Sequence, residues 1–190
     1  NILTSGAGYV GLKNLGATCY LNSLLQSLFH IPAFRKIVYE IPISDSEDEI
    51  GSIPLNLQRL FYQLQFSKDP CSTVDLTKSF GWTDDEVILE QDVDEFIRML
   101  INSLQEKLIG TELENSIPNL MRGRYRNTFT CININHQTVK EDDFYDISLN
   151  VEKIPNLHES FKAYVKPEDL IGDNQYQTES FGKQDAVMKA

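Results

Sequence analysis

The chain has 190 residues, of which 41% are hydrophobic, and its formal net charge is −11 at pH 7. This length and hydrophobic content exclude a disordered chain and are typical of one globular domain or a large part of one. The negative charge argues against nucleic acid as a partner and suits a neutral or basic protein surface. No apolar run approaches the roughly 20 residues of a membrane helix, and the first residues do not resemble a signal peptide, so we expect no membrane association.

The number and spacing of the cysteines indicate the cellular compartment of the protein. Cys19, Cys71 and Cys131 are too few and too scattered for a disulfide framework, which favours a reducing compartment, the cytoplasm or the nucleus. The chain begins at Asn1 without a methionine and stops at Ala190 within a polar stretch. We therefore expect a trimmed chain, a processed piece, or one half of a larger domain.

A helix is predicted to begin at Cys19. Apolar residues follow at the spacing of one helical face, at Leu21, Leu24, Leu25, Leu28 and Phe29. Thr18 is the expected N-cap, with its hydroxyl accepting a hydrogen bond from an amide of the first turn. Gly11 and Gly16 precede it and predict a tight loop. The partial positive charge at a helix N-terminus favours a thiolate, so Cys19 is a candidate nucleophile.

Asn14 lies in the same loop, and its side-chain amide could donate to an oxyanion beside that sulfur. Each residue alone has a plainer interpretation: a cysteine is more often a small buried hydrophobe, and an asparagine among glycines a turn former. The longer string is more specific. Residues 11–26, GLKNLGATCYLNSLLQ, closely resemble the cysteine box of the ubiquitin-specific proteases. The resemblance implies that Cys19 is the nucleophile of a deubiquitinating enzyme and that Asn14 helps to form its oxyanion hole.

Three further helices are expected before residue 81. The patterns place one around Phe34–Val38, one from an N-cap at Ser52 to Leu64, and one from Ser72 to Phe80 with Gly81 as C-cap. The acidic residues 44–49 between the first two predict a solvated surface loop.

Trp82, the chain's only tryptophan, follows Gly81 in an expected loop. Burial habits favour an anchor that packs this loop onto the core. Residues 76–82, LTKSFGW, resemble a segment of the herpesvirus-associated branch of these proteases, which implies a mobile loop near the active cleft. The two interpretations are compatible.

The strongest helical pattern runs from Val93 to Leu108 and ends at Gly110. Its start, residues 90–96 (EQDVDEF), is dense in carboxylates, which ordinarily complement a helix dipole. The string also resembles the family's Gln-Asp box, which lines the channel for the arginine-rich C-terminal tail of ubiquitin. Gln91 and Asp92 match this motif most directly, so the resemblance implies that they bind the tail. Glu95 lies three residues after Asp92 on the same helical face, so both carboxylates could pair with the tail's guanidinium groups.

Past Gly110 the composition changes to alternating apolar residues, which predicts antiparallel strands near 125–131 and 145–151. A short helix is expected over Leu157–Val165, then a turn at 172–174 and an extended piece near Tyr176. Helices first and strands afterwards predict an α+β chain. Residues 143–149 and 168–176 also resemble the finger region of the family.

The resemblance implies a papain-like fold with thumb, palm and fingers, of which this chain holds the N-terminal portion. Residues 1–122 would form the helical thumb-like part with the cysteine box, and residues 123–190 a β-rich part of the fingers and palm. Many family members bind zinc in the fingers through paired cysteines. This part holds only Cys131, so we expect no zinc and no other cofactor.

A cysteine hydrolase also needs a base, and the histidines are His30, His136 and His158. His30 ends the helix that begins at Cys19, about 16 Å along its axis, and the other two are most simply surface residues. In the family the catalytic histidine and its Asp or Asn partner come from a later segment, so we expect this chain alone to be inactive. The implied partners are ubiquitin and ubiquitinated proteins. The alternatives are a non-catalytic ubiquitin-binding module on the same fold and a scaffold with a structural cysteine.

Overall fold

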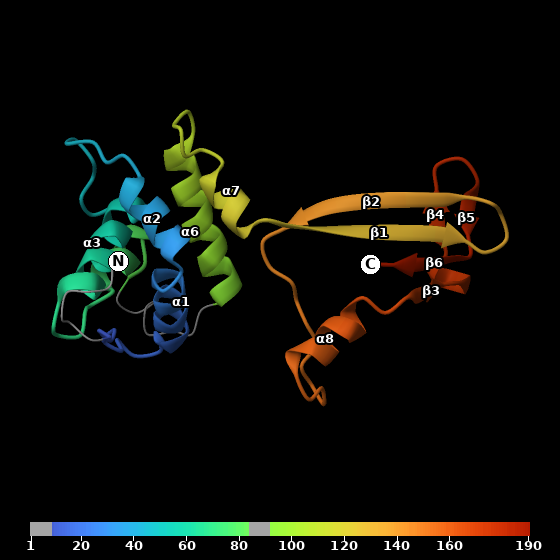
Figure 1. Cartoon of the computed structure of the whole chain (residues 1–190), viewed down its shortest axis with the longest axis horizontal. Coiled ribbons are helices and arrows are strands. Elements are labelled where there is room, and N and C mark those ends of the chain that lie inside the picture. The colour runs from blue at the N-terminus through green and yellow to red at the C-terminus, as the bar shows by residue number, and fades with distance from the viewer. Residues whose placement is uncertain (1–8, 84–91) are drawn as a thin grey trace. The chain divides into compact units, whose positions relative to one another are not determined.

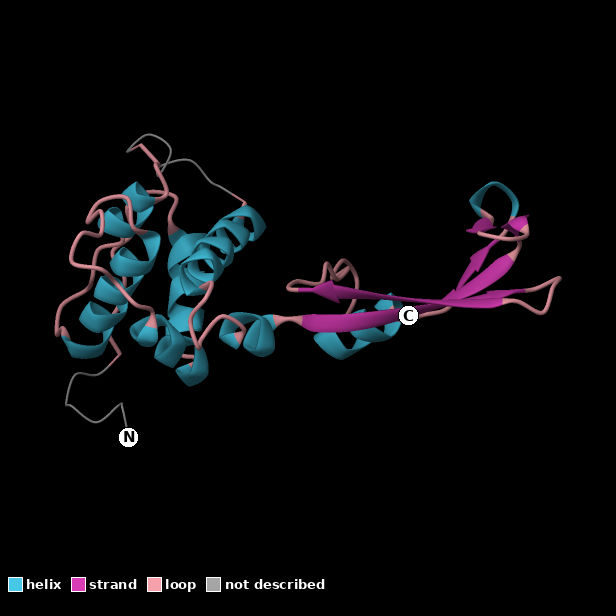
Figure 2. Cartoon of the chain, turned by 90° about the horizontal axis from the view of Figure 1, so that it is seen from above, coloured by secondary structure: helices cyan, strands magenta, loops and turns pink. Residues whose placement is uncertain are grey.

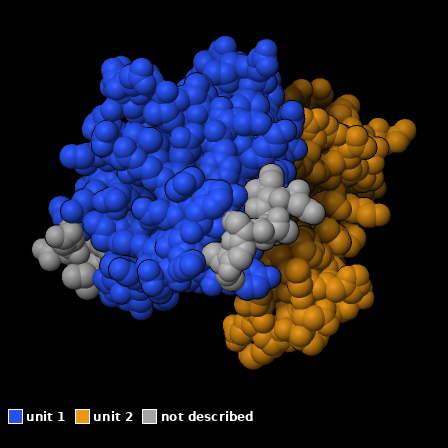
Figure 3. All heavy atoms as spheres, turned by 60° about the vertical axis from the view of Figure 1, so that its left-hand side comes forward, with its two compact units in different colours: residues 1–120 blue, residues 121–190 orange. Residues whose placement is uncertain are grey.

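The computed structural model describes residues 9–83 and 92–190. The chain divides into two compact units, residues 1–120 and 121–190, which Figure 3 shows in different colours. The first unit is helical and the second holds the strands (Figure 2). Helices therefore precede strands along the chain, which confirms the predicted mixed α and β order.

The first unit is built from short helices joined by loops (Figure 1). They are α1 (Cys19–Phe29), α2 (Pro32–Glu40), α3 (Ile53–Phe66), α4 (Val74–Ser79), α6 (Val93–Leu108) and α7 (Ser116–Met121), the last of which ends at the boundary. The helices that we predicted are present. Helix α7 was not predicted, because its six residues are too few to show an apolar period.

Apolar faces of these helices meet in the core of the first unit. Helix α1 contacts α2 and α6, and α3 contacts α2, α4 and α6. The fully buried side chains with the largest volumes include Phe34, Phe61, Phe96, Leu21, Leu25, Leu57, Leu100 and Leu104. Burying each such side chain contributes about 1.5–3 kcal/mol. The predicted stripe of α1 is buried except for Leu24, which is partly exposed.

Glycines end two of the helices because the backbone there turns into the left-handed region. Gly81 follows α4 with a φ of 78°, and Gly110 follows α6 with a φ of 76°. A side chain at either position would be strained. The predicted stops at these glycines are confirmed.

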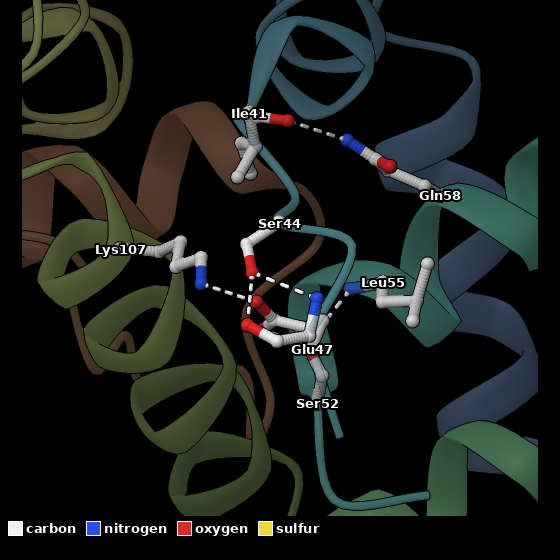
Figure 4. A network of polar contacts seen from close by, with 8 residues as sticks. Ile41, Ser44, Glu47, Ser52, Leu55, Gln58 and Lys107 are labelled. Atoms are coloured by element: carbon white, nitrogen blue, oxygen red, sulfur yellow. Dashed lines mark hydrogen bonds and ion pairs between the residues drawn. The ribbon is translucent and has the colours of Figure 1, made fainter. Parts of the chain in front are cut away.

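The acidic loop between α2 and α3 is more than a solvated connector. Glu47 accepts hydrogen bonds from Ser52 Oγ at 2.7 Å and from Lys107 Nζ at 2.6 Å (Figure 4). Ser52 Oγ in turn accepts from the backbone nitrogen of Leu55 at 3.3 Å. The bond from the Lys107 ammonium, and after it the bond from Ser52, lowers the pKa of the Glu47 carboxyl. One carboxylate thus joins the loop, the N-terminus of α3 and the last turn of α6.

The second unit contains two antiparallel sheets. The larger has the strand order β2-β1-β6-β3, and the smaller pairs β4 with β5. The strands are β1 (Gly123–Cys131), β2 (Gln137–Phe144), β3 (Glu168–Leu170), β4 (Tyr176–Thr178), β5 (Gly182–Gln184) and β6 (Ala186–Lys189). Helix α8 (Leu157–Tyr164) and the 3₁₀ turn η1 (Gly172–Asn174) lie between them in sequence, as predicted.

The prediction of a strand over residues 145–151 is wrong. These residues, all of them described, are irregular, and the strand that pairs with β1 is Gln137–Phe144. Acidic residues of β2 pair with arginines of β1: Arg124 Nε donates to Asp143 Oδ1 at 2.8 Å, and Arg126 Nε to Glu141 Oε1 at 2.7 Å. Because ion pairs take the place of an apolar face there, β2 lacks the alternation by which strands are recognised.

Residues 9–83 and 92–190 contain neither a membrane-spanning helix nor a cluster of metal-binding side chains. No helix in those ranges is long and apolar enough to cross a membrane. Nor do the same ranges contain three or more His, Cys, Asp or Glu side chains placed to hold a metal ion.

Candidate active site

Cys19 is the first residue of α1, and its side chain is exposed. The carbonyl of the preceding Thr18 already accepts a helical hydrogen bond from the backbone nitrogen of Asn22 at 2.9 Å. Gly16 has a φ of 120°, which lets the chain turn sharply into the helix. The predicted placement of a cysteine at the mouth of a helix, behind a tight glycine loop, is confirmed.

A backbone bridge to a distant segment fixes the start of this loop. Leu12 and Cys71 form an isolated parallel bridge. The backbone nitrogen of Lys13 donates to the Cys71 carbonyl at 2.8 Å, and the Cys71 nitrogen donates to the Gly11 carbonyl at 2.9 Å. The Cys71 side chain is buried, and burial raises the pKa of its thiol. Cys71 therefore has a structural place under the loop, in contrast to the exposed Cys19.

Two side chains of α1 hold the same loop from the other side. Gln26 Nε2 donates to the Val10 carbonyl at 2.8 Å, and Asn22 Nδ2 donates to the Lys13 carbonyl at 3.1 Å. With the bridge to Cys71, these bonds fix both edges of the segment before Asn14. The segment before Asn14 is thus held both by Cys71 and by two side chains of α1.

Asn14 is held by its amide oxygen. Oδ1 accepts from the backbone nitrogen of Gly16 and from Thr18 Oγ1, both at 3.2 Å. Since the amide is planar, Nδ2 points away from these donors, and it donates to no atom of the described part of the chain. The side chain therefore presents a free N–H donor on the exposed side of the loop that carries Cys19.

The predicted cap at Thr18 is wrong in its bonding. Thr18 occupies the N-cap position, but its hydroxyl makes no bond to the first turn of α1. Oγ1 instead accepts from the backbone nitrogen of Leu15 at 3.0 Å and donates to Asn14. With φ −85° and ψ 14°, the Thr18 backbone is not in the extended conformation typical of a capping residue, and the side chain turns back into the loop.

The acidic start of α6 is also exposed. Asp92 is the N-cap, and its Oδ1 accepts from the backbone nitrogen of Asp94 at 2.8 Å, which leaves Oδ2 available. Glu95, in the first turn, is exposed as well. Gln91, the third residue assigned to tail binding, lies outside the described residues. The structure thus brings two accessible carboxylates together at one helix end.

Trp82 packs onto the first unit. Its ring lies 5.6 Å from the Phe80 ring and 5.7 Å from the Phe96 ring, between centroids, and Phe96 is fully buried on α6. The side chain is half-buried. These contacts confirm an anchor between the end of α4 and the first turns of α6, while a role in an active cleft stays a prediction.

No histidine of the first unit can reach Cys19. Within the described part of that unit the histidine is His30, the C-cap of α1, and its Nδ1 lies 2.8 Å from the Gln26 carbonyl. It is separated from Cys19 by the 11 residues of α1, about 16 Å at the helical rise. His136 lies in the turn between β1 and β2, and His158 lies in the first turn of α8.

Sequence reasoning missed the residues that position Asn14 and the loop. Thr18, Asn22, Gln26 and Cys71 act through hydrogen bonds that no hydrophobic period reveals. Only the long cysteine-box string, in which Thr18, Asn22 and Gln26 are embedded, marks them for attention.

Comparison with known proteins gives a consistent result. The family described as "Ubiquitin carboxyl-terminal hydrolase" matches residues 10–180. The chain is 48% identical over 179 residues to "Ubiquitin carboxyl-terminal hydrolase 5" of Schizosaccharomyces pombe. It is 46% identical to "Ubiquitin C-terminal hydrolase 12" of Arabidopsis thaliana and to "Ubiquitin carboxyl-terminal hydrolase 7" of Drosophila melanogaster.

Each of these alignments covers 94% of this chain but only 16% of the relative. The chain therefore corresponds to a small part of the proteins that it matches. The family match itself extends across both units and includes the loop of Asn14, Cys19 and the start of α6. The chain belongs to the ubiquitin carboxyl-terminal hydrolase family.

Proposed function

We propose that this chain is the nucleophile-bearing part of a deubiquitinating thiol isopeptidase, which cleaves the bond after the C-terminal glycine of ubiquitin. The observation that carries the proposal is the exposed Cys19 at the first residue of α1, preceded by a loop in which Asn14 presents an unoccupied amide donor. Membership of the family supports it. Ubiquitin and ubiquitinated proteins are then the partners.

The proposed chemistry follows from these two side chains. The Cys19 thiolate attacks the carbonyl carbon of the terminal glycine, and the carbonyl electron pair moves onto oxygen. Asn14 Nδ2 donates to that oxyanion. Collapse of the tetrahedral species breaks the carbon–nitrogen bond, the leaving amine takes up a proton, and water then hydrolyses the thioester. The family resemblance assigns the proton transfers to a histidine of a later segment.

The start of α6 suits a basic tail. Asp92 and Glu95 are three residues apart and exposed, so both can pair with guanidinium groups of an extended peptide. Gln91 belongs to the same proposed tail site through the family motif. We place Trp82 at the edge of this site, since its ring contacts Phe96 in the first turn of α6.

The finer assignments rest on sequence motifs. Residues 76–82 favour the herpesvirus-associated branch of the family. A papain-like architecture is proposed in which the helical part, residues 1–122, is thumb-like and residues 123–190 belong to the fingers and palm. The scattered cysteines favour the cytoplasm or the nucleus.

A ubiquitin probe with a thiol-reactive C-terminus tests the function directly in the intact protein. We expect covalent labelling that falls to background in Cys19→Ala and persists in Cys131→Ala, because Cys131 is buried in β1. Labelling that survives Cys19→Ala would overturn the assignment of the nucleophile. Reversible binding without labelling of the wild type would favour the non-catalytic module, and no interaction would leave the scaffold.

A further inference from the structure

We propose that Thr18 is a positioning residue, whose hydroxyl fixes the orientation of the Asn14 amide so that nitrogen, and not oxygen, faces the reacting carbonyl. The inference rests on the proposed function and adds to it a residue outside the nucleophile and the oxyanion donor. It follows from the bond of 3.2 Å between Thr18 Oγ1 and Asn14 Oδ1.

The orientation matters because the two ends of a primary amide have nearly the same shape and opposite polarity. With Nδ2 outward, Asn14 offers a donor to a developing oxyanion. With Oδ1 outward, it would present a partial negative charge to the same atom and oppose the reaction. Rotation about the last side-chain bond interconverts the two, so something must select one of them.

The hydrogen bond from Gly16 alone favours this orientation of the Asn14 amide only weakly. The Gly16 backbone N–H donates to Oδ1 at 3.2 Å, in a turn that is exposed to water, where a lost hydrogen bond is readily replaced. Thr18 differs because it is 1% exposed. No water can readily take the place of a partner at such a site.

The Thr18 hydroxyl has one hydrogen to donate, and Asn14 Oδ1 accepts it. Oγ1 already accepts from the backbone nitrogen of Leu15 at 3.0 Å, and its single hydrogen points to Asn14 Oδ1. If the Asn14 amide flipped, this hydrogen would face an N–H₂ group and lose its acceptor within a buried site. Leaving a buried hydroxyl donor unpaired is costly, so the flipped amide is disfavoured.

The start of α1 gives independent support. A threonine kept for helix stability would bond the amides of the first turn, but α1 has no side-chain cap bond. The Thr18 hydroxyl is used entirely within the loop, between Leu15 and Asn14. Its loss should therefore affect the state of Asn14 more than the helix.

The test compares kcat and KM for a ubiquitin C-terminal amide that releases a fluorophore, with the intact protein. Removing an oxyanion donor typically lowers kcat by about 10²–10³-fold. We expect Thr18→Val, which only allows the donor to turn away, to lower kcat about tenfold while KM changes less than about twofold. Thr18→Ser keeps the hydroxyl and should restore most of the rate.

A double-mutant cycle with Asn14→Ala separates positioning from a general structural role. If Thr18 acts through Asn14, Thr18→Val should change kcat by less than about twofold once Asn14 is absent. An equal loss in both backgrounds, equal rates of Thr18→Val and Thr18→Ser, or no loss in Thr18→Val would each overturn the inference. If Thr18→Val fails to fold, Thr18→Ala, which also removes the hydroxyl, takes its place in both backgrounds with Thr18→Ser as the control. Activity that does not depend on Cys19 would instead overturn the proposed function.

Discussion

Three helices of the first unit, α1, α3 and α4, have a hydroxyl residue at the N-cap, and α3 and α1 use theirs in opposite ways. At α3, Ser52 Oγ accepts from the first turn through Leu55 and donates to Glu47. At α1, Thr18 Oγ1 makes no bond to the helix and orders Asn14 in the preceding loop. The same chemical group stabilises a helix in one loop and orients a side chain in the other.

The difference shows how a scaffold and a site are built from similar parts. The loop before α3 ends in a closed network, in which Glu47 and Lys107 join it to α6 (Figure 4). The loop before α1 is fixed at its edges by Cys71 and Gln26, but leaves Asn14 Nδ2 and the Cys19 side chain available. Satisfied polar groups stabilise the fold, whereas unsatisfied exposed ones remain for a ligand.

The largest expected effect comes from Asn14→Asp in the loop before α1. The carboxylate keeps an acceptor for Gly16 and Thr18 but has no N–H to donate, and its charge opposes an oxyanion. We expect kcat to fall by at least about 10²-fold in the intact protein, while the free energy of unfolding changes by less than about 0.5 kcal/mol because the site is exposed. Steady-state kinetics and chemical denaturation measure the two quantities. An unchanged kcat would remove Asn14 from the proposed oxyanion hole.

A change in the loop before α3 should have the converse result. Glu47→Gln weakens the bonds to Lys107 and Ser52, and we expect it to lower the free energy of unfolding by about 1 kcal/mol with kcat unchanged. Denaturation of wild type and variant at several pH values is the measurement. A loss of activity without a loss of stability would contradict the division between the two loops.

The pH dependence of that difference has a definite sign. The pKa of Glu47 is lowered below 4.5 in the folded state, so its ionised form contributes stability that is fully present above the unfolded value. The contribution is lost as the pH falls through the folded pKa. The gap between wild type and Glu47→Gln should therefore be constant near neutral pH and shrink below about pH 4.5.

The two loops also show what the sequence can and cannot predict. The apolar spacing of α1, α3 and α6 predicted these helices, and the glycines at 81 and 110 predicted the ends of α4 and α6. Burial and backbone sterics leave such a periodic or local signal. The hydroxyl of Thr18 and the carboxylate of Glu47 bond partners that depend on tertiary placement. Strand β2 was missed for the same reason, since its ion pairs with Arg124 and Arg126 depend on the register with β1.

The smallest expected effect concerns the cap of α3 itself. Ser52→Ala removes the acceptor for the Leu55 amide and one donor to Glu47. We expect this change to destabilise the first turn of α3 by about 1 kcal/mol. Hydrogen exchange of the amides in that turn should then be roughly fivefold faster. Ser52→Thr retains the hydroxyl and serves as the control. The exchange rates of amides in α1 should not change in Ser52→Ala. They should change little in Thr18→Val, because the Thr18 side chain does not cap α1. Thr18→Val could instead accelerate exchange in the first turn of α1 as much as Ser52→Ala does in α3. Both hydroxyls would then stabilise helices, and the contrast between the two loops would be wrong.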